Sequence, residues 1–159
     1  MENSPSRLRF NSLINPQFNP AINPEVNASL NPLYNALLHP ERNVRIGPKF
    51  NHSLNPQFTP SLNPNSNSAL DLAKTMNFSG RYRLSPDAEV QGYVVHTINK
   101  AVFLIFDVDL QWVAYAVDNG RQGYNLFSPE GEWKGYLLRN GAGSLNEFNL
   151  EGEWVALIR

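Results

Sequence analysis

The chain of 159 residues contains no cysteine, which excludes a disulfide framework, a thiolate metal site and a cysteine nucleophile. A formal net charge of −1 provides no long-range field to collect nucleic acid, anionic membrane or acidic substrates. No apolar run reaches the roughly 18 residues of a membrane-spanning helix, and the N-terminus lacks the apolar core of a secretory signal. The absence of a signal peptide and of a transmembrane segment predicts a cytoplasmic protein without membrane insertion.

The motifs of common catalytic and cofactor sites are also missing. The three histidines are far apart, and the chain has no HExxH spacing, no glycine-rich phosphate loop and no G-x-S-x-G. Residues 78–159 carry 7 basic and 10 acidic side chains with no basic stripe, which argues against a nucleic-acid partner. We therefore expect no enzymatic activity, no catalytic or metal-ligating residues and no cofactor.

Asparagine and proline, in contrast, are abundant and repeat along the first half of the chain. Asparagine occurs 21 times, 15 of them before residue 78. Over residues 10–62 every fourth residue is apolar except Arg42, the next residue is usually asparagine, and the one after that is often proline. The unit is x-Φ-N-P, in phase for fourteen copies, and in places aliphatic and aromatic residues alternate with a period of eight.

This pattern predicts a chain of β-turns. Proline at such short intervals excludes a helix or a central strand, whereas asparagine followed by proline suits the first two positions of a type I turn. Chained turns would form a spiral or solenoid with an apolar stripe, buried against itself, another chain or the second half. A disordered spacer remains the alternative. The interaction stripe is predicted to consist of Phe18, Ile22, Tyr34, Phe50, Leu54 and Phe58.

Residues 65–77 form the boundary between the halves. Asn67 or Ser68 is suited to cap a short helix over residues 69–76, with Leu70, Leu72 and Met76 on its apolar face. We therefore divide the chain into a repeat tract (1–64), a short helical linker (65–77) and a small all-β domain (78–159).

A second repeat occupies residues 78–159. Phenylalanine recurs at 106, 127 and 148, tryptophan at 112, 133 and 154, and a shift of 22 recovers a fourth copy around Val90. Each unit reads as strand, tight turn, strand, with Gly131 and Gly152 at the positions that require positive φ. Ala88 and Leu110 occupy the same position in the other two units, and we expect those turns to adopt another geometry.

Four similar hairpins would share one core around a pseudo-four-fold axis. The units F-D-V-D-L-Q-W-V-A-Y, F-S-P-E-G-E-W-K-G-Y and F-N-L-E-G-E-W-V-A-L resemble the four-fold β-flower module. The upstream Asn-Pro tract resembles the tandem repeat that precedes such modules in some uncharacterised bacterial proteins. The resemblance implies this fold and a bacterial or phage source, and it carries no catalytic residues.

The aromatic residues of the hairpins have two interpretations. The tryptophans should pack together or line one face, and aromatic residues of a small β domain usually form its core. If they instead line an open pocket, they would suit a sugar or a small apolar ligand, with Lys134 and Asn125 as polar contacts. This ligand ring would consist of Trp112, Trp133, Trp154, Tyr115 and Tyr136.

The sequence thus predicts a mainly β protein whose turn-repeat tract precedes four pseudo-repeated hairpins. The leading hypothesis is a non-enzymatic structural or protein-protein interaction protein, in which the tract is an extended binding or self-assembly surface and the hairpin domain a compact head. Its partner would be another protein or a second copy of the chain. The alternative is a ligand-binding, lectin-like module that uses the aromatic ring.

Overall fold

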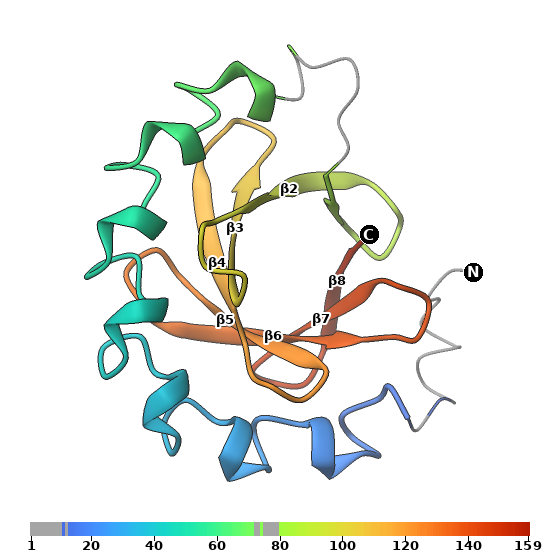
Figure 1. Ribbon diagram of the computed structural model, residues 1–159. Helices are drawn as coiled ribbons and strands as arrows, with labels where there is room; N and C mark the ends of the chain where they lie inside the picture. Colours follow the sequence, from blue (N-terminus) through green and yellow to red (C-terminus); the bar gives the residue numbers. More distant parts are fainter. Residues whose placement is uncertain (1–10, 12, 72–73, 75–79) are drawn as a thin grey trace.

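The computed structural model describes residues 11, 13–71, 74 and 80–159, and its mainly β class is the class predicted. Eight antiparallel strands form a closed barrel in which each strand pairs with the next and β8 pairs with β1 (Figure 1). The helical elements of the described residues are all short 3-10 turns. The strands are β1 (Tyr82–Leu84), β2 (Val90–His96), β3 (Val102–Asp107), β4 (Trp112–Asp118), β5 (Gly123–Phe127), β6 (Trp133–Arg139), β7 (Leu145–Asn149) and β8 (Trp154–Ile158).

The barrel has two apolar layers, because side chains along a strand alternate between its inside and its outside. One set packs together without any residue of the tract and fills the interior. The opposite set points outward and packs against the tract. The interior set comprises Val94, Phe103, Ile105, Ala116, Leu126, Leu137, Leu145 and Ile158.

The Asn-Pro tract follows the outside of the barrel as an arc of short turns (Figure 1). A 3-10 turn recurs every eight residues, and an ordinary turn separates each from the next. The repeating structural unit is therefore an octapeptide, twice the length of the sequence unit. The 3-10 turns are η1 (Pro20–Ile22), η2 (Ala28–Leu30), η3 (Ala36–Leu38), η4 (Val44–Ile46), η5 (His52–Leu54), η6 (Pro60–Leu62) and η7 (Ser68–Leu70).

Asparagine side chains hold successive octapeptides together. The Asn35 Oδ1 accepts a hydrogen bond from the Leu37 amide, which caps η3, while its Nδ2 donates to the Ser29 carbonyl of the preceding unit (2.8 Å). Asn43 and Asn67 repeat both contacts. Because each side chain satisfies backbone groups of two units, the asparagine repeat fixes both the turn and the spacing between turns.

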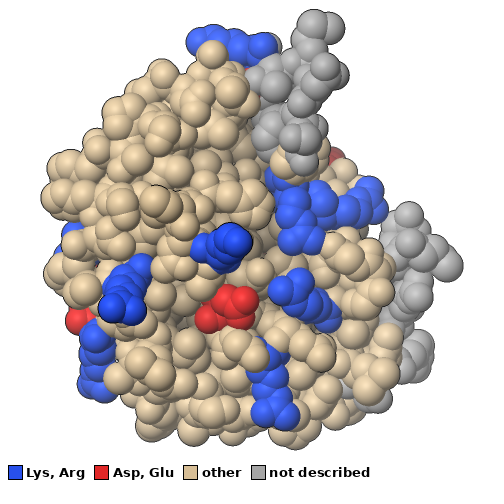
Figure 2. All heavy atoms as spheres, in the orientation of Figure 1, with Lys and Arg blue, Asp and Glu red and all other residues tan. Residues whose placement is uncertain are grey.

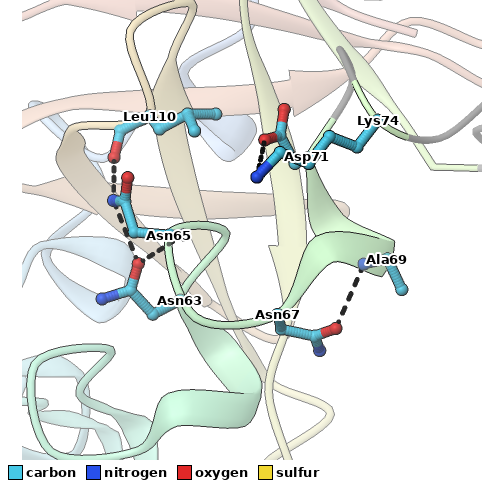
Figure 3. A network of polar contacts seen from close by, with 7 residues as sticks. All are labelled: Asn63, Asn65, Asn67, Ala69, Asp71, Lys74 and Leu110. Atoms are coloured by element: carbon cyan, nitrogen blue, oxygen red, sulfur yellow. Dashed lines mark hydrogen bonds and ion pairs between the residues drawn. The ribbon is translucent and has the colours of Figure 1, made fainter.

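Three further asparagines attach the tract to the barrel. Asn65 Nδ2 donates to the Leu110 carbonyl in the β3–β4 turn (3.1 Å; Figure 3). From the barrel side, Asn99 Nδ2 donates to the Arg45 carbonyl (3.1 Å). Asn125 Nδ2, buried on β5, donates to the Leu30 carbonyl (2.9 Å).

The tract presents two apolar rows on opposite faces. One aliphatic residue per octapeptide points inward and packs on the outer face of the barrel. The apolar residue four positions later points outward. The sequence left open whether the apolar residues of the tract are buried against the tract itself, another chain or the second half of the chain. In the structure the inward row is buried against the second half. The buried members of the inward row are Ile14, Leu30, Leu38, Ile46, Leu54 and Leu62.

Two local expectations need correction or fall outside the described residues. Ala88 (φ 65°) and Leu110 (φ 63°) adopt the same positive φ as Gly131 and Gly152, so the expected change of turn geometry is wrong. Each closes the same turn, with the Leu110 amide donating to the Asp107 carbonyl, and the hairpin tolerates a strain of about 1–2 kcal/mol. In the linker, residues 68–70 form η7, and the remaining predicted helical positions 72, 73, 75 and 76 lie outside the described residues.

The inward row predicts that the tract contributes directly to the stability of the fold. Leu54 is fully buried in the layer between tract and barrel, so Leu54→Ala should lower the free energy of unfolding by about 2–5 kcal/mol. Tyr34→Ala, at an outward position with 77% exposure, should change it by less than about 0.5 kcal/mol. Urea denaturation of both variants provides the comparison, and equal small effects would show that the tract is not part of the core.

Barrel closure gives a second prediction. Deletion of residues 155–159 removes most of β8, which pairs with both β7 and β1, and leaves two open edges. We expect the truncated chain to lose its cooperative thermal transition, monitored by circular dichroism. A truncated protein that still melts cooperatively near the full-length temperature would contradict this.

Candidate functional site

The predicted ligand ring does not line an open pocket. Tyr115 and Tyr136 are completely buried, and each stacks on a phenylalanine of the next strand, Phe127 (5.4 Å between ring centroids) and Phe148 (5.5 Å). These pairs lie on the outer face of the barrel, where the tract covers them. Their rings are therefore inaccessible to a ligand, which corrects the open-pocket interpretation for both tyrosines.

The three tryptophans also do not pack as one group. Trp112 packs against one outer apolar cluster, Trp154 against the other, and Trp133 against both. The indole N–H of Trp112 donates to the Ala114 carbonyl (2.9 Å), and that of Trp154 donates to the Ala156 carbonyl (2.7 Å). Trp112 and Trp154 therefore form hydrogen bonds within their own strands, and all three tryptophans pack against the apolar clusters between barrel and tract.

Burial has an electrostatic consequence for these tyrosines. Desolvation raises the pKa of Tyr115 and Tyr136 well above the ordinary value, and carboxylates of the tract, Glu41 and Glu25 respectively, raise each further. Within the described part of the chain, neither hydroxyl has a hydrogen-bond partner. The layer therefore accepts these side chains only in their neutral form.

The six residues of the predicted interaction stripe are divided between the two faces of the tract. Ile22 and Leu54 belong to the inward row, so their assignment to an accessible stripe is corrected. The other four point outward, with exposed fractions of 50–77%. Together with Val26 (64% exposed) they form the outward row, which we define as Phe18, Val26, Tyr34, Phe50 and Phe58.

A cavity of about 310 Å³ opens at the mouth of the barrel, and sequence reasoning did not identify it. Arg83 forms a two-pronged ion pair with the buried Glu147, with Nε to Oε1 at 2.8 Å and Nη2 to Oε2 at 2.9 Å. Arg83 Nη1 also donates to Gln91 Oε1 (2.8 Å), and the contact with Glu147 raises the pKa of the guanidinium. The cavity is lined by Arg83, Gln91, Ile105, Asp107, Val113, Ala114, Leu126, Lys134 and Glu147.

The two polar residues proposed for a ligand pocket have separate positions. Lys134 does line the cavity, and its ammonium contacts Glu132 Oε2 at 2.8 Å on the surface. This pairing lowers the pKa of Glu132 and raises that of Lys134. Asn125 lies elsewhere, beneath the tract, where it binds the Leu30 carbonyl. Of these two residues, Lys134 alone lines the cavity.

Charged residues are sorted between the two ends of the barrel. The turns that follow β1, β3, β5 and β7 lie at one end and contain seven acidic residues and no lysine or arginine. The opposite end carries Asp118 and five basic residues. Among the charged side chains on the face shown in Figure 2, lysine and arginine outnumber aspartate and glutamate. The five basic residues are Arg81, Lys100, Arg121, Arg139 and Arg159.

Among residues 11, 13–71, 74 and 80–159, no group of three or more histidine, aspartate or glutamate side chains is placed to hold a metal ion. Nor does any helix in this part of the chain combine the length and the apolar character needed to cross a membrane. The outward row offers apolar contact, and the cavity offers hydrogen bonds beside an aliphatic wall.

No protein-family model, curated protein or solved structure matches the chain. The resemblance to β-flower modules therefore stays a prediction.

The buried tyrosines predict a specific loss of stability at alkaline pH. An unfolded tyrosine ionises near its ordinary pKa of 10, whereas the folded chain holds Tyr115 and Tyr136 neutral to higher pH. Above pH 10 the unfolded state binds fewer protons, so the free energy of unfolding should fall by about 1.4 kcal/mol per pH unit for each of them. Tyr115→Phe/Tyr136→Phe should reduce this fall.

Urea denaturation between about pH 9 and about pH 11.5 measures the effect. Tyr34→Phe is the matched control, because it makes the same substitution at a tyrosine that is 77% exposed. A double variant with the same alkaline slope as the unsubstituted protein would contradict the proposed neutral burial.

Proposed function

We propose that this chain is a non-enzymatic protein-protein interaction protein, and that the outward row of the tract is its binding surface. In this proposal the Asn-Pro tract is an extended turn solenoid, and the four pseudo-repeated hairpins are the compact body that supports it. The partner is another protein that provides an apolar surface. The observation that carries the proposal is the exposure of a large apolar side chain at the same position of successive octapeptides.

The regularity of this exposure distinguishes the outward row from scattered apolar residues on an ordinary surface. Phe18, Val26 and Tyr34 follow one another at intervals of eight, and Phe50 and Phe58 continue the series after Arg42. Isolated exposed apolar residues need no explanation, whereas exposed apolar residues that recur at one repeat position extend along one surface and indicate an interaction site. Aromatic residues supply much of the binding energy in such interfaces.

The outward side chains are also held in place before binding. The Phe58 ring stacks on His52 with 4.0 Å between centroids and an interplanar angle of 11°, and the Lys49 ammonium lies 5.5 Å from the centroid of the Phe50 ring. The backbone beneath them is fixed by asparagine bridges and by the inward row. Such preorganisation favours binding because less conformational entropy is lost when the partner docks.

The triple substitution Phe18→Ser/Phe50→Ser/Phe58→Ser tests this surface. All three side chains point outward, so the variant should keep the thermal stability of the unsubstituted protein and lose association with its partner. Partner capture from a lysate, followed by identification and re-binding of the captured protein, gives the readout. Sedimentation velocity of the isolated chain shows whether the partner is instead a second copy.

The matched control is Ile98→Ser/Val108→Ser, which removes two exposed apolar side chains of the barrel (82% and 56% exposed) and leaves the tract intact. It should bind as the unsubstituted protein does. If the triple variant retains both the oligomeric state and the captured partner, the outward row is not the binding surface.

A further inference from the structure

We propose that the cavity at the mouth of the barrel binds a small zwitterion with an aliphatic body, the class of free aliphatic α-amino acids. This site is separate from the outward row and does not depend on the proposed function of the tract. Mouths of β-barrels are recurrent positions for small-ligand sites. The volume of about 310 Å³ lies at the lower end of the range for such sites, roughly 300–1,000 Å³, and therefore selects a small molecule.

The cavity departs from the hairpin repeat at two of four equivalent positions. Arg83, Ile105, Leu126 and Glu147 occupy equivalent positions on β1, β3, β5 and β7, immediately before the irregularity in each strand register. In two repeats the position is aliphatic and packs in the barrel interior. In the other two it is charged, and those two side chains form an ion pair with each other.

Stability of the fold does not explain why charged residues replace aliphatic ones at these two positions. The Glu147 side chain is buried and that of Arg83 is one-quarter exposed, so forming the pair removes charge from water at a cost, and aliphatic residues of similar size in place of such a pair are often neutral or stabilising. The barrel already uses that solution at Ile105 and Leu126. A charged pair beside a cavity is therefore better explained by recognition of something polar inside it.

The cavity contains both a hydrogen-bond donor and an acceptor with unused capacity among the described residues. Arg83 uses two N–H groups on Glu147 and one on Gln91, which leaves one on Nη1 and one on Nη2 without a partner in the described residues. Asp107 uses Oδ1 to accept the amides of Asp109 and Gln111 in its turn, and its Oδ2 accepts none from the part of the chain that the structure describes. A carboxylate fits the guanidinium, and an ammonium group fits Asp107.

The charged groups of the lining that keep unused hydrogen-bonding positions have opposite signs. Lys134 is paired with Glu132, whereas Arg83 keeps two N–H groups and Asp107 keeps Oδ2 without a partner among the described residues. A zwitterion matches both of these groups, whereas a free anion or a free cation matches one. The aliphatic residues of the lining provide the contact for a branched side chain: Ile105, Val113, Ala114 and Leu126.

Isothermal titration calorimetry of the full-length protein with L-leucine and L-valine tests the assignment. We expect saturable binding of both and none of inorganic phosphate or D-glucose. Arg83→Met/Glu147→Leu removes the two charges together, so the barrel should stay folded, with a melting temperature equal to or above that of the unsubstituted protein. This double variant should bind leucine at least about tenfold more weakly.

Ala114→Leu provides a second, independent variant, because it fills the cavity without changing a charge, and it should abolish leucine binding. Its matched control is Ala142→Leu in the exposed β6–β7 loop at the other end of the barrel, which should bind normally. The Phe18→Ser/Phe50→Ser/Phe58→Ser variant should also bind leucine normally, so a failure of the proposed interaction surface leaves this result unaffected.

Three results would overturn the proposal. One is the absence of saturable leucine or valine binding at millimolar concentration. Another is binding that survives in Ala114→Leu, which would place the ligand outside the cavity. The third is binding of glucose or phosphate in preference to the amino acids, which would show that the class of ligand is wrong.

Discussion

The contact between the outer face of the barrel and the inward row of the tract determines most of this structure. The outer face carries stacked tyrosine–phenylalanine pairs. Such an aromatic belt would promote aggregation if it were exposed to solvent. The tract buries this belt with one aliphatic side chain per octapeptide. A barrel of about 80 residues gains little from its interior alone, so this second layer supplies apolar burial that a small domain lacks.

The same contact explains why the outward row exists. Two x-Φ-N-P units make one octapeptide, and each octapeptide turns through both faces of the tract, so only one of its two apolar residues reaches the barrel. Leu54 is therefore fully buried while Phe58, four residues later, is exposed. Asparagine serves both positions equally, because its side chain bridges neighbouring units whichever way the preceding residue points. The outward side chain is thus not constrained by packing against the barrel.

This division also shows what the sequence can and cannot predict. Proline and asparagine act on their own neighbours, so turns and a mainly β class follow from local rules. Which Φ position faces inward depends on contacts with strands far along the chain, and the tetrapeptide period treats Ile22 and Phe18 alike. The prediction of an open ligand ring was wrong for the same reason, because contacts with the distant tract bury Tyr115. The ion pair of the cavity joins residues 64 positions apart and was visible only as two breaks in a repeat.

Those breaks follow a simple rule. In an up-and-down barrel every second connection lies at the same end, so a repeated acidic turn makes one end acidic without any charged run in the sequence. Where all four repeats carry similar side chains, packing in four equivalent surroundings explains the residue type. Where one repeat carries a different side chain, its residue type must be explained by its own contacts. Arg83 and Glu147 depart together, at adjoining places around one cavity, and that coincidence is the structural argument for a ligand site there.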